Sequence, residues 1–237
     1  MPSPTHSIAL LIPAFNEAES IGLQLAQVPR DLFDQIIVVD NGSTDGTASV
    51  ASAAGAEAHS EPCRGYGQAC LTGLAHLRPE ITAVVFMDGD LSDDPADAVR
   101  LIQFFNDHQL DLLVGSRVLG KSEPGSLTPV QRFGNWLTTR LLRWLWGVSF
   151  TDLGPFRVVS REALDRLQMR DRNFGWTVEM QAKAAVLGLR CGEIPVNYRR
   201  RRFGQSKISG TIMGSARAGA KILGTVLRCW TESRTTK

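Results

Sequence analysis

The sequence is poor in cysteine and has none at a metal-binding spacing. Its four cysteines are Cys63, Cys70, Cys191 and Cys229, and no two of them form a C-x-x-C pair. No cluster of histidines accompanies them. A zinc site or a disulfide framework is therefore not expected, and a reducing compartment suits the chain better.

A basic leader and long hydrophobic runs are also missing. The opening residues MPSPTHS carry no Lys or Arg ahead of the short apolar run 8–12, so they do not resemble a secretory signal. No window supplies the ~18–20 nearly uncharged apolar residues of a membrane-spanning helix. We therefore expect a cytoplasmic protein that is soluble or peripheral on the cytoplasmic face of a membrane.

The net charge is small but unevenly distributed. The 237 residues include 26 Lys and Arg against 24 Asp and Glu, a net charge of +2. Residues 1–115 carry 4 basic and 16 acidic groups, whereas residues 116–237 carry 22 basic and 8 acidic groups. This split predicts a cation-binding region facing a phosphate- or membrane-binding region. The 43% hydrophobic content excludes a mainly disordered chain, and we expect one domain over residues 1–237 with these two halves.

The first half alternates short apolar segments with helical patterns. Strands are predicted over 8–13, 35–40, 82–87 and 112–115, and helices over 17–28, 46–54, 67–77 and 95–106, the last with Pro95 as its first residue. Continuous apolar strands separated by helices indicate an α/β fold with a doubly wound, mostly parallel sheet. Ligands of such sheets bind beyond the carboxyl ends of the strands.

The second half adds basic helices. Helices are predicted over 128–146, 161–167, 175–187 and 211–230, and strands over 154–159 and 191–198. The helix 128–146 places Arg132, Arg140 and Arg143 in one narrow arc, with Val130, Phe133, Leu137, Leu141 and Trp144 facing the other way. The helix 211–230 carries a stripe of Arg217, Lys221 and Arg228.

These basic helices allow two interpretations. They could pack on the sheet with their charges outward, or they could contact a membrane. Trp136, Trp144 and Trp146 stand beside the arginines and favour the membrane surface, where such helices bind anionic lipid. The run 199–202 could be a solvated face or a nucleic-acid patch, but it lacks interleaved aromatics, so no nucleic-acid partner is expected.

Asp88 and Asp90 directly follow a predicted buried strand, with Gly89 between them. Hard divalent cations such as Mg²⁺ or Mn²⁺ take carboxylate oxygens and often share them with substrate phosphates. The alternative is a solvated acidic loop, because Asp93 and Asp94 follow immediately.

Two further polar clusters follow predicted strands, at 13–17 and at 40–47. Their small polar groups could bind a base and a ribose, or they could form only a turn and a helix N-cap, as expected for Asp45 and Thr47. We expect both clusters and the Asp88–Asp90 pair to meet at one edge of the sheet.

Together these motifs resemble a known enzyme family. Four segments occur in the order and approximate spacing typical of the inverting family 2 glycosyltransferases with the GT-A fold: Pro13-x-x-Asn16-Glu17, Asp40-x-Gly42-Ser43-x-Asp45-Gly46-Thr47, Asp88-x-Asp90 and Gly115-Ser116-Arg117. Four later segments are similar to the dolichyl-phosphate mannose or glucose synthase branch: Gly154-Pro155-Phe156-Arg157, 176–180, 193–196 and Arg202-x-Gly204-x-Ser206-Lys207. The resemblance covers roughly residues 8–210.

The resemblance implies transfer of a hexose from GDP-mannose or UDP-glucose to a polyprenyl or dolichyl phosphate, with Mg²⁺ or Mn²⁺ as cofactor. It implies a nucleoside pocket lined by Pro13, Glu17 and Asp40, with Asn16, Gly42 and Ser43 as further substrate-binding candidates. It implies metal ligation by Asp88 and Asp90. Phosphate binding would fall to Arg117, Arg132, Arg202 and Lys207, with Gly204 and Ser206 letting their loop close as a lid. The catalytic candidates are Asp90, Arg117 and Glu179.

The nature of the acceptor decides what Glu179 must do. A phosphate monoester has its second pKa near ~6, so it is already anionic at neutral pH and needs no strong base. An alcohol or glycan acceptor would need a general base, for which Glu179 is the candidate. Glu179 could instead orient an arginine or the sugar, or be a surface charge.

Two other protein classes fit less well. Sugar-nucleotidyltransferases usually carry a Gly-rich basic loop after the first strand, where this chain has 13–17. A non-catalytic lipid- or nucleotide-binding protein would not need Asp88 and Asp90. The chain departs from the family pattern at Asn41, where many members have a second acid after Asp40, at Ser92, where the synthase branch usually has Gln, and at Pro155, which interrupts the usual Gly-Phe-Arg. The base and the sugar therefore stay open. The oligomeric state stays open as well.

Overall fold

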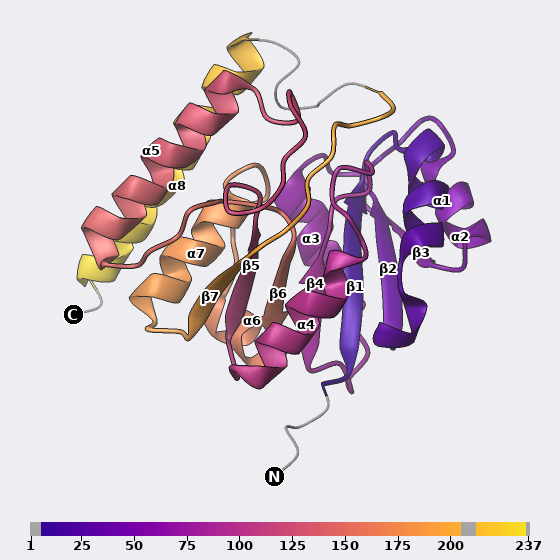
Figure 1. The fold of residues 1–237 in the computed structure, drawn as a ribbon, viewed down its shortest axis with the longest axis horizontal. Helices are drawn as coiled ribbons and strands as arrows, with labels where there is room; N and C mark the ends of the chain where they lie inside the picture. Colours follow the sequence, from indigo (N-terminus) through magenta and orange to yellow (C-terminus); the bar gives the residue numbers. More distant parts are fainter. Residues whose placement is uncertain (1–5, 205–211, 236–237) are drawn as a thin grey trace.

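The computed structural model describes residues 6–204 and 212–235. One sheet forms the centre of this part of the chain, flanked by helices (Figure 1). Its strands are β1 (Ile8–Ala14), β2 (Gln35–Asp40), β3 (Glu57–Ser60), β4 (Ala83–Phe86), β5 (Leu112–Ser116), β6 (Arg157–Ser160) and β7 (Cys191–Pro195). Their order across the sheet is β3-β2-β1-β4-β6-β5-β7.

The sheet is mostly parallel, as the sequence predicts. Only β6 among these strands runs against its neighbours, pairing antiparallel with β4 and β5. The ends of β1, β2, β4, β5 and β7 therefore point to one edge, the carboxyl edge. This edge receives the polar segments that follow those strands.

The helices are α1 (Ala18–Gln27), α2 (Thr47–Ala53), α3 (Tyr66–Ala75), α4 (Asp97–Asp107), α5 (Pro129–Trp146), α6 (Arg161–Leu167), α7 (Trp176–Val186) and α8 (Ile212–Thr235), with a short 3₁₀ turn η1 (Arg30–Leu32). Several predicted boundaries were wrong, and α8 ends at Thr235 rather than at residue 230. Pro95 precedes α4 by a turn rather than starting it. β6 begins only at Arg157, after Pro155, which has no N–H to donate to a strand partner. β7 ends at Pro195, where its pairing with β5 ends.

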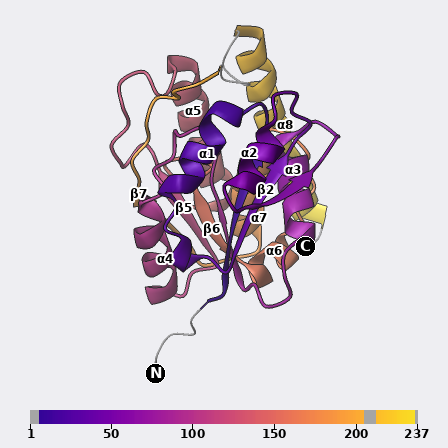
Figure 2. The same ribbon diagram turned by 90° about the vertical axis from the view of Figure 1, so that its right-hand side faces the viewer.

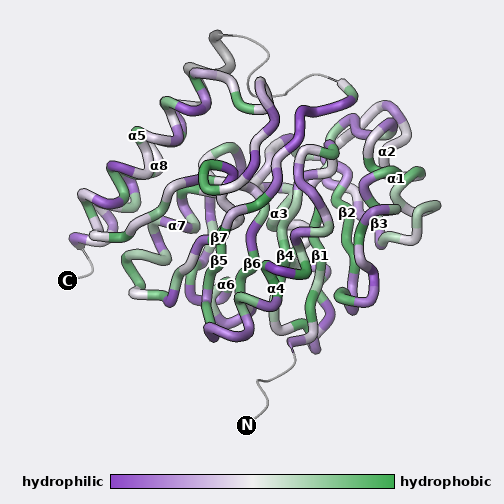
Figure 3. The backbone as a smooth tube through the Cα atoms, viewed as in Figure 1, coloured by the Kyte–Doolittle hydropathy of each residue, from purple (hydrophilic) through white to green (hydrophobic). Residues whose placement is uncertain are grey.

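Apolar side chains fill both faces of the sheet. Leu10 and Ile12 of β1 pack with α1 and α4 on one face, whereas Ala9 and Leu11 pack on the opposite face with α3, α6 and α7. Figure 2 shows α1 and α4 on one side of the strands and α3, α6 and α7 on the other. Figure 3 shows the strands as the hydrophobic centre. The alternation explains why these short apolar runs form strands in a doubly covered sheet.

Helices α5 and α8 lie side by side at the β7 end of the molecule, next to α7 (Figure 1). Thr128 caps α5, because its hydroxyl accepts from the Gln131 N–H while the Gln131 side chain accepts from the Thr128 N–H. No helix in the described part of the chain is both long and apolar enough to span a membrane.

The predicted division of α5 into an arginine face and an opposed aromatic face was wrong. The buried residues of α5 are Thr138, Thr139 and Leu142. Phe133, Trp136 and Trp144 are exposed by 61%, 53% and 80%. Arg132, Arg140 and Arg143 are exposed as well. Because these positions recur every three or four residues, aromatic and basic side chains share one exposed face.

Candidate active site

The loops that follow β1 and β2 interlock at the carboxyl edge. The Asn16 N–H donates to Ser43 Oγ (2.8 Å), and the Thr44 N–H donates to Asn16 Oδ1 (2.9 Å). Asp40 Oδ1 accepts from the Ser43 N–H (3.0 Å). Gly42 adopts a φ of 74°, which a residue without Cβ reaches without strain. The two predicted clusters therefore form one surface, which begins beside the half-buried Pro13 of β1.

Glu17 is buried beneath this surface. Its N–H donates to Thr47 Oγ1 (2.9 Å), and its Oε2 accepts from the Ser20 hydroxyl (2.9 Å). Its Oε1 pairs with Arg201. Burial raises the pKa of the Glu17 carboxyl, although Arg201 partly offsets the rise. Asp45 and Thr47 form the turn of the structural alternative, since Asp45 Oδ1 accepts from the Thr47 N–H and hydroxyl. The helix N-cap expected there was wrong, because the N-cap of α2 is Gly46 and no side chain caps it.

The loop after β4 gathers three carboxylates. The Asp88 N–H donates to Asp93 Oδ2 (3.0 Å), and the Ser92 N–H donates to Asp90 Oδ1 (3.0 Å). Asp93 is 1% exposed, and its Oδ1 is buried without a hydrogen-bond partner among the described residues. The alternative of a solvated acidic loop is therefore wrong for Asp93. Asp94 is ion-paired with Arg199 (2.6 Å).

The electrostatics of this loop fit a divalent cation. Burial, and next the charge of Asp90, raises the pKa of Asp88. Burial and the charge of Asp88 likewise raise the pKa of Asp93. Among the described residues no three His, Cys, Asp or Glu side chains are arranged to hold a metal by themselves. Two carboxylates that share a cation with substrate phosphates are the usual arrangement for Mg²⁺, and Asp88 and Asp90 suit it.

Arg117 follows β5 and is held by a residue that the sequence did not reveal. Its guanidinium binds Asp152 at two points, Nε to Oδ2 (2.7 Å) and Nη2 to Oδ1 (2.8 Å). Burial alone would raise the pKa of Asp152, but Arg117 outweighs it and the pKa is lowered. Arg117 also lies over the Tyr198 ring, 5.0 Å from its centroid. The signal for Asp152 in the sequence was only its place just before the Gly154–Arg157 motif.

The arginine that enters the carboxylate cluster is Arg201. Its Nη1 lies 3.0 Å from Asp90 Oδ2, and its Nη2 contacts Glu17. The predicted Arg202 is exposed. Along an extended segment successive side chains point to opposite sides, which explains the difference. Ser206 and Lys207 lie outside the described residues.

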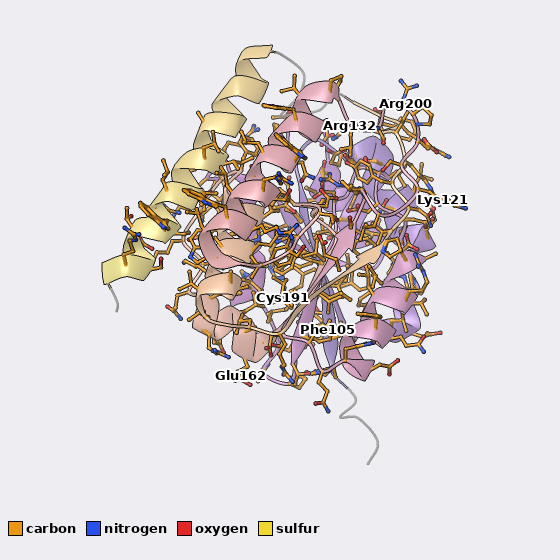
Figure 4. All side chains as sticks on the ribbon, turned by 60° about the vertical axis from the view of Figure 1, so that its left-hand side comes forward. Phe105, Lys121, Arg132, Glu162, Cys191 and Arg200 are labelled. Atoms are coloured by element: carbon orange, nitrogen blue, oxygen red, sulfur yellow. The ribbon has the colours of Figure 1, made fainter. Side chains whose placement is uncertain are left out.

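Arg132 is exposed near the start of α5. Figure 4 shows it at the same end of the molecule as Lys121 and Arg200, with Glu162 at the other end. The structure thus places Arg132 on the side of the carboxyl edge, but on the outer face of α5.

The structure does not bring Glu179 to the carboxylate cluster. Glu179 is 1% exposed on α7 and accepts from the N–H groups of Arg170 and Asp171 (Oε2, 3.1 and 2.7 Å). It also pairs with Lys183 (2.9 Å). Its oxygens hold the loop before α7. Glu179 is therefore not a surface charge, and it does not lie at the catalytic position that the resemblance implies.

One of the two interpretations of the last helix had its charges pointing outward, but two charges of α8 pair with carboxylates of this chain. Lys221 pairs with Asp171 (2.9 Å), and Arg228 lies 3.5 Å from Glu179. Both side chains therefore tie α8 to the loop before α7 and to α7. The side chain of Arg217 lies outside what the structure describes.

Asn41, at the position where the family usually has a second acid, faces the loop 61–65 instead of the strand-end surface. Its Nδ2 donates to the carbonyls of Glu61 (3.1 Å) and Cys63 (2.7 Å), and its Oδ1 accepts from the Gly65 N–H (2.7 Å). This loop places the Arg64 guanidinium 3.6 Å from the centroid of the Phe15 ring. Asn41 therefore shapes the rim of the candidate nucleoside pocket indirectly.

Comparison with known proteins identifies the family of the chain. Residues 9–168 match the profile described as "Glycosyl transferase family 2". The chain belongs to this family and is a glycosyltransferase. An uncharacterized glycosyltransferase of Mycobacterium tuberculosis is 36% identical over 88% of this chain and 93% of that protein.

Two relatives carry more specific names. Undecaprenyl-phosphate mannosyltransferase of Micrococcus luteus is 29% identical over 88% of this chain and 90% of its own length. Polyprenol monophosphomannose synthase of Mycolicibacterium smegmatis is 29% identical over 88% of this chain and 83% of its own.

The fold also matches a solved structure. Glucosyl-3-phosphoglycerate synthase of M. tuberculosis, in complex with Mn²⁺, UDP-glucose and phosphoglyceric acid, superimposes with a TM-score of 0.77 at 23% identity, over 95% of this chain and 80% of that one. This likeness confirms the GT-A fold.

Proposed function

We propose that the protein is a metal-dependent, inverting hexosyltransferase that moves a sugar from a nucleotide-diphosphate donor to a polyprenyl phosphate. The observation that carries the proposal is the convergence of Glu17, Asp88 and Asp90 with Arg117 at the carboxyl edge. GDP-mannose and UDP-glucose are the candidate donors. The two relatives named for polyprenyl-phosphate mannose synthesis support the lipid acceptor.

The donor would lie across the interlocked loops 13–17 and 40–47. Asp40, Asn16 and Ser43 present polar groups to the nucleoside at this surface. Asp88 and Asp90 would hold Mg²⁺ or Mn²⁺, which when bound supplies positive charge to the departing nucleoside diphosphate. The named fold neighbour was solved with Mn²⁺ and UDP-glucose, which supports this type of donor.

The acceptor phosphate would be bound by Arg117. Asp152 binds one edge of the Arg117 guanidinium through Nε and Nη2, so the guanidinium is oriented before the acceptor arrives. A phosphate with its second pKa near ~6 is already a nucleophile at neutral pH. The proposed reaction thus needs no carboxylate base, and the structural engagement of Glu179 is in keeping with this.

A lipid acceptor requires access to a membrane surface. The exposed face of α5 combines Phe133, Trp136 and Trp144 with three arginines. Aromatic rings enter the headgroup region and arginines pair with anionic lipid phosphates. We infer that this face holds the enzyme on the bilayer that carries its acceptor, in the cytoplasm.

The proposal is tested by measuring thermal unfolding with a panel of UDP- and GDP-sugars, each with and without Mn²⁺ or Mg²⁺. A ligand that binds only the folded state raises the melting temperature. One nucleotide sugar that stabilises only with metal supports the proposal, and a flat response to every donor contradicts it. Transfer to a water-soluble alcohol but not to a lipid phosphate would favour the alternative acceptor class.

A further inference from the structure

Arg201 occupies the space between the nucleoside loop and the metal-ligand candidates. Its Nη1 contacts Asp90 Oδ2 at 3.0 Å, and its Nη2 contacts Glu17 Oε1. Its Nε donates to the carbonyl of Phe203 (2.8 Å), so the guanidinium is held in place from its own segment. Only 18% of the side chain is exposed. Arg201 is therefore a built-in counter-ion of these carboxylates.

The contact with Asp90 uses the oxygen that a metal would need. Asp90 Oδ1 already accepts from the Ser92 N–H, which leaves Oδ2 as the oxygen free of the loop's own backbone. Arg201 binds that oxygen. A cation bound at Asp90 Oδ2 would lie next to the positively charged guanidinium of Arg201, and the two like charges repel each other. Cation binding by Asp90 Oδ2 therefore competes with the Arg201 contact.

Arg201 belongs to a segment that crosses the carboxyl edge, residues 196–204, which we call the strap. Figure 3 shows its arginine run as a hydrophilic stretch over this edge. The Arg199 N–H donates to the carbonyl of Ser92 (2.8 Å), and Tyr198 forms an isolated antiparallel β-bridge with Asp93. The strap is thus bonded directly to the loop that contains Asp88 and Asp90.

The strap is also bonded to the loop that follows β5. The Tyr198 N–H donates to the carbonyl of Lys121 (2.9 Å), and the Glu123 N–H donates to the carbonyl of Tyr198 (2.9 Å). Arg117 lies over the ring of the same tyrosine. A movement of the strap would therefore shift residues at both the proposed donor site and the proposed acceptor site.

We propose that Arg201 competes with the divalent cation for Asp90, so that cation binding releases the strap and leaves Arg201 available to the phosphates of the incoming donor. This inference rests on the proposed function, because it assigns the cation to Asp90. In the cation-free state Arg201 neutralises the carboxylates and holds the strap over the edge. The cation releases the strap, and the donor phosphates then give Arg201 a new anionic partner.

The first test measures Mn²⁺ binding directly, from the paramagnetic resonance signal of free Mn²⁺, in the absence of any nucleotide. Arg201→Gln removes the competing cation. Arg200→Gln is the matched control, because it removes one positive charge from the next residue, whose side chain is exposed. Asp90→Asn shows which part of the binding belongs to Asp90.

We expect Arg201→Gln to bind Mn²⁺ about tenfold or more tightly than Arg200→Gln, the factor expected for a lost charge-assisted hydrogen bond. The gain should vanish in the double variant with Asp90→Asn. An Mn²⁺ affinity of Arg201→Gln no tighter than that of Arg200→Gln overturns the proposal.

The second test uses the unmodified protein, which guards against a variant that misfolds. Hydrogen exchange of the amides of residues 197–204 should speed up when Mn²⁺ binds and slow again when a nucleoside diphosphate is added. Exchange that Mn²⁺ leaves unchanged or slows contradicts the proposal. Neither test measures sugar transfer. Tighter Mn²⁺ binding by Arg201→Gln together with no sugar transfer by the unmodified enzyme would refute the proposed function alone. Transfer by the unmodified enzyme together with an unchanged Mn²⁺ affinity of Arg201→Gln would refute this inference alone.

Discussion

Arg117 and Asp152 form a bidentate ion pair. Asp152 is fully buried, and it also accepts from the Arg117 backbone N–H at 2.8 Å. The carboxylate thus fixes both the backbone and the side chain of the arginine at the end of β5. Three hydrogen bonds to one residue give the guanidinium a single orientation toward the carboxyl edge.

Breaking this pair should cost both stability and acceptor binding. Asp152→Asn leaves the Arg117 charge without its partner, and loss of one member of a buried pair costs about 3–5 kcal/mol. Asp111→Asn is the control, because Asp111 pairs with the exposed Arg190, and surface pairs are worth about 0–1 kcal/mol. Urea unfolding measures the difference. A similar, small loss in both variants would show that Asp152 does not hold Arg117.

Kinetic measurements on Asp152→Asn separate a loss of Arg117 positioning from a loss of folding. In conditions where Asp152→Asn is folded, we expect KM for the lipid phosphate to rise while donor binding, measured by thermal shift, stays unchanged. An equal loss of donor and acceptor binding would contradict the acceptor role of Arg117.

Asn41 should not tolerate the acid that the family usually has at its position. Asp in its place cannot donate to the carbonyls of Glu61 and Cys63, and it sets a negative charge against both. We expect Asn41→Asp to lower the free energy of unfolding by about 1–3 kcal/mol and by more than Asn41→Ala, which loses the same donors without adding charge. The reverse order in chemical unfolding would mean that the loop 61–65 rearranges to admit the acid.

Glu61 should make stability depend on acid pH. Hydrogen bonds from Gln68, Thr72 and the Cys63 N–H lower the pKa of Glu61 from its ordinary value of 4.5 to about 2. Because the folded pKa is depressed, its contribution is fully present above pH 4.5 and is lost as the pH falls toward 2. The difference in unfolding free energy between the wild type and Glu61→Gln should therefore shrink over this range. A constant difference would contradict the assignment.

The exposed face of α5 should bind anionic lipid vesicles. The double variant Trp136→Ala, Trp144→Ala removes two exposed rings, and we expect at least about a tenfold loss of vesicle partitioning with little change in melting temperature. Leu23→Ala with Val99→Ala is the control, since these exposed apolar residues lie on α1 and α4. Equal partitioning of both double variants would exclude this face as the membrane contact.

The sequence predicts those strands and loops that depend on the local pattern of apolar and polar residues. The apolar runs of β1, β2 and β4 and the polar residues after them define the sheet and its carboxyl edge, because strand direction brings their ends together. The strand β3 escaped prediction because Glu57–Ser60 is short, polar and only partly buried at the sheet edge.

The residues that the sequence misses depend on partners chosen across long distances. Asp152 is distinguished only by its pairing with Arg117, 35 residues earlier, and Arg201 by contacts with Glu17 and Asp90. Lys221 and Arg228 form a basic stripe in the sequence, yet both pair with buried carboxylates on and before α7. A run of four arginines does not itself say which of them points inward.

The central claim is tested most directly by the transfer of labelled hexose from GDP-mannose or UDP-glucose to polyprenyl phosphate, with and without Mg²⁺ or Mn²⁺. Asp90→Asn is compared with Asp94→Asn, because Asp94 belongs to the same loop but is paired with Arg199. We predict transfer that requires metal and falls roughly a hundredfold or more in Asp90→Asn while Asp94→Asn keeps most of it. Transfer that persists without metal, or that Asp90→Asn leaves unchanged, would contradict the account.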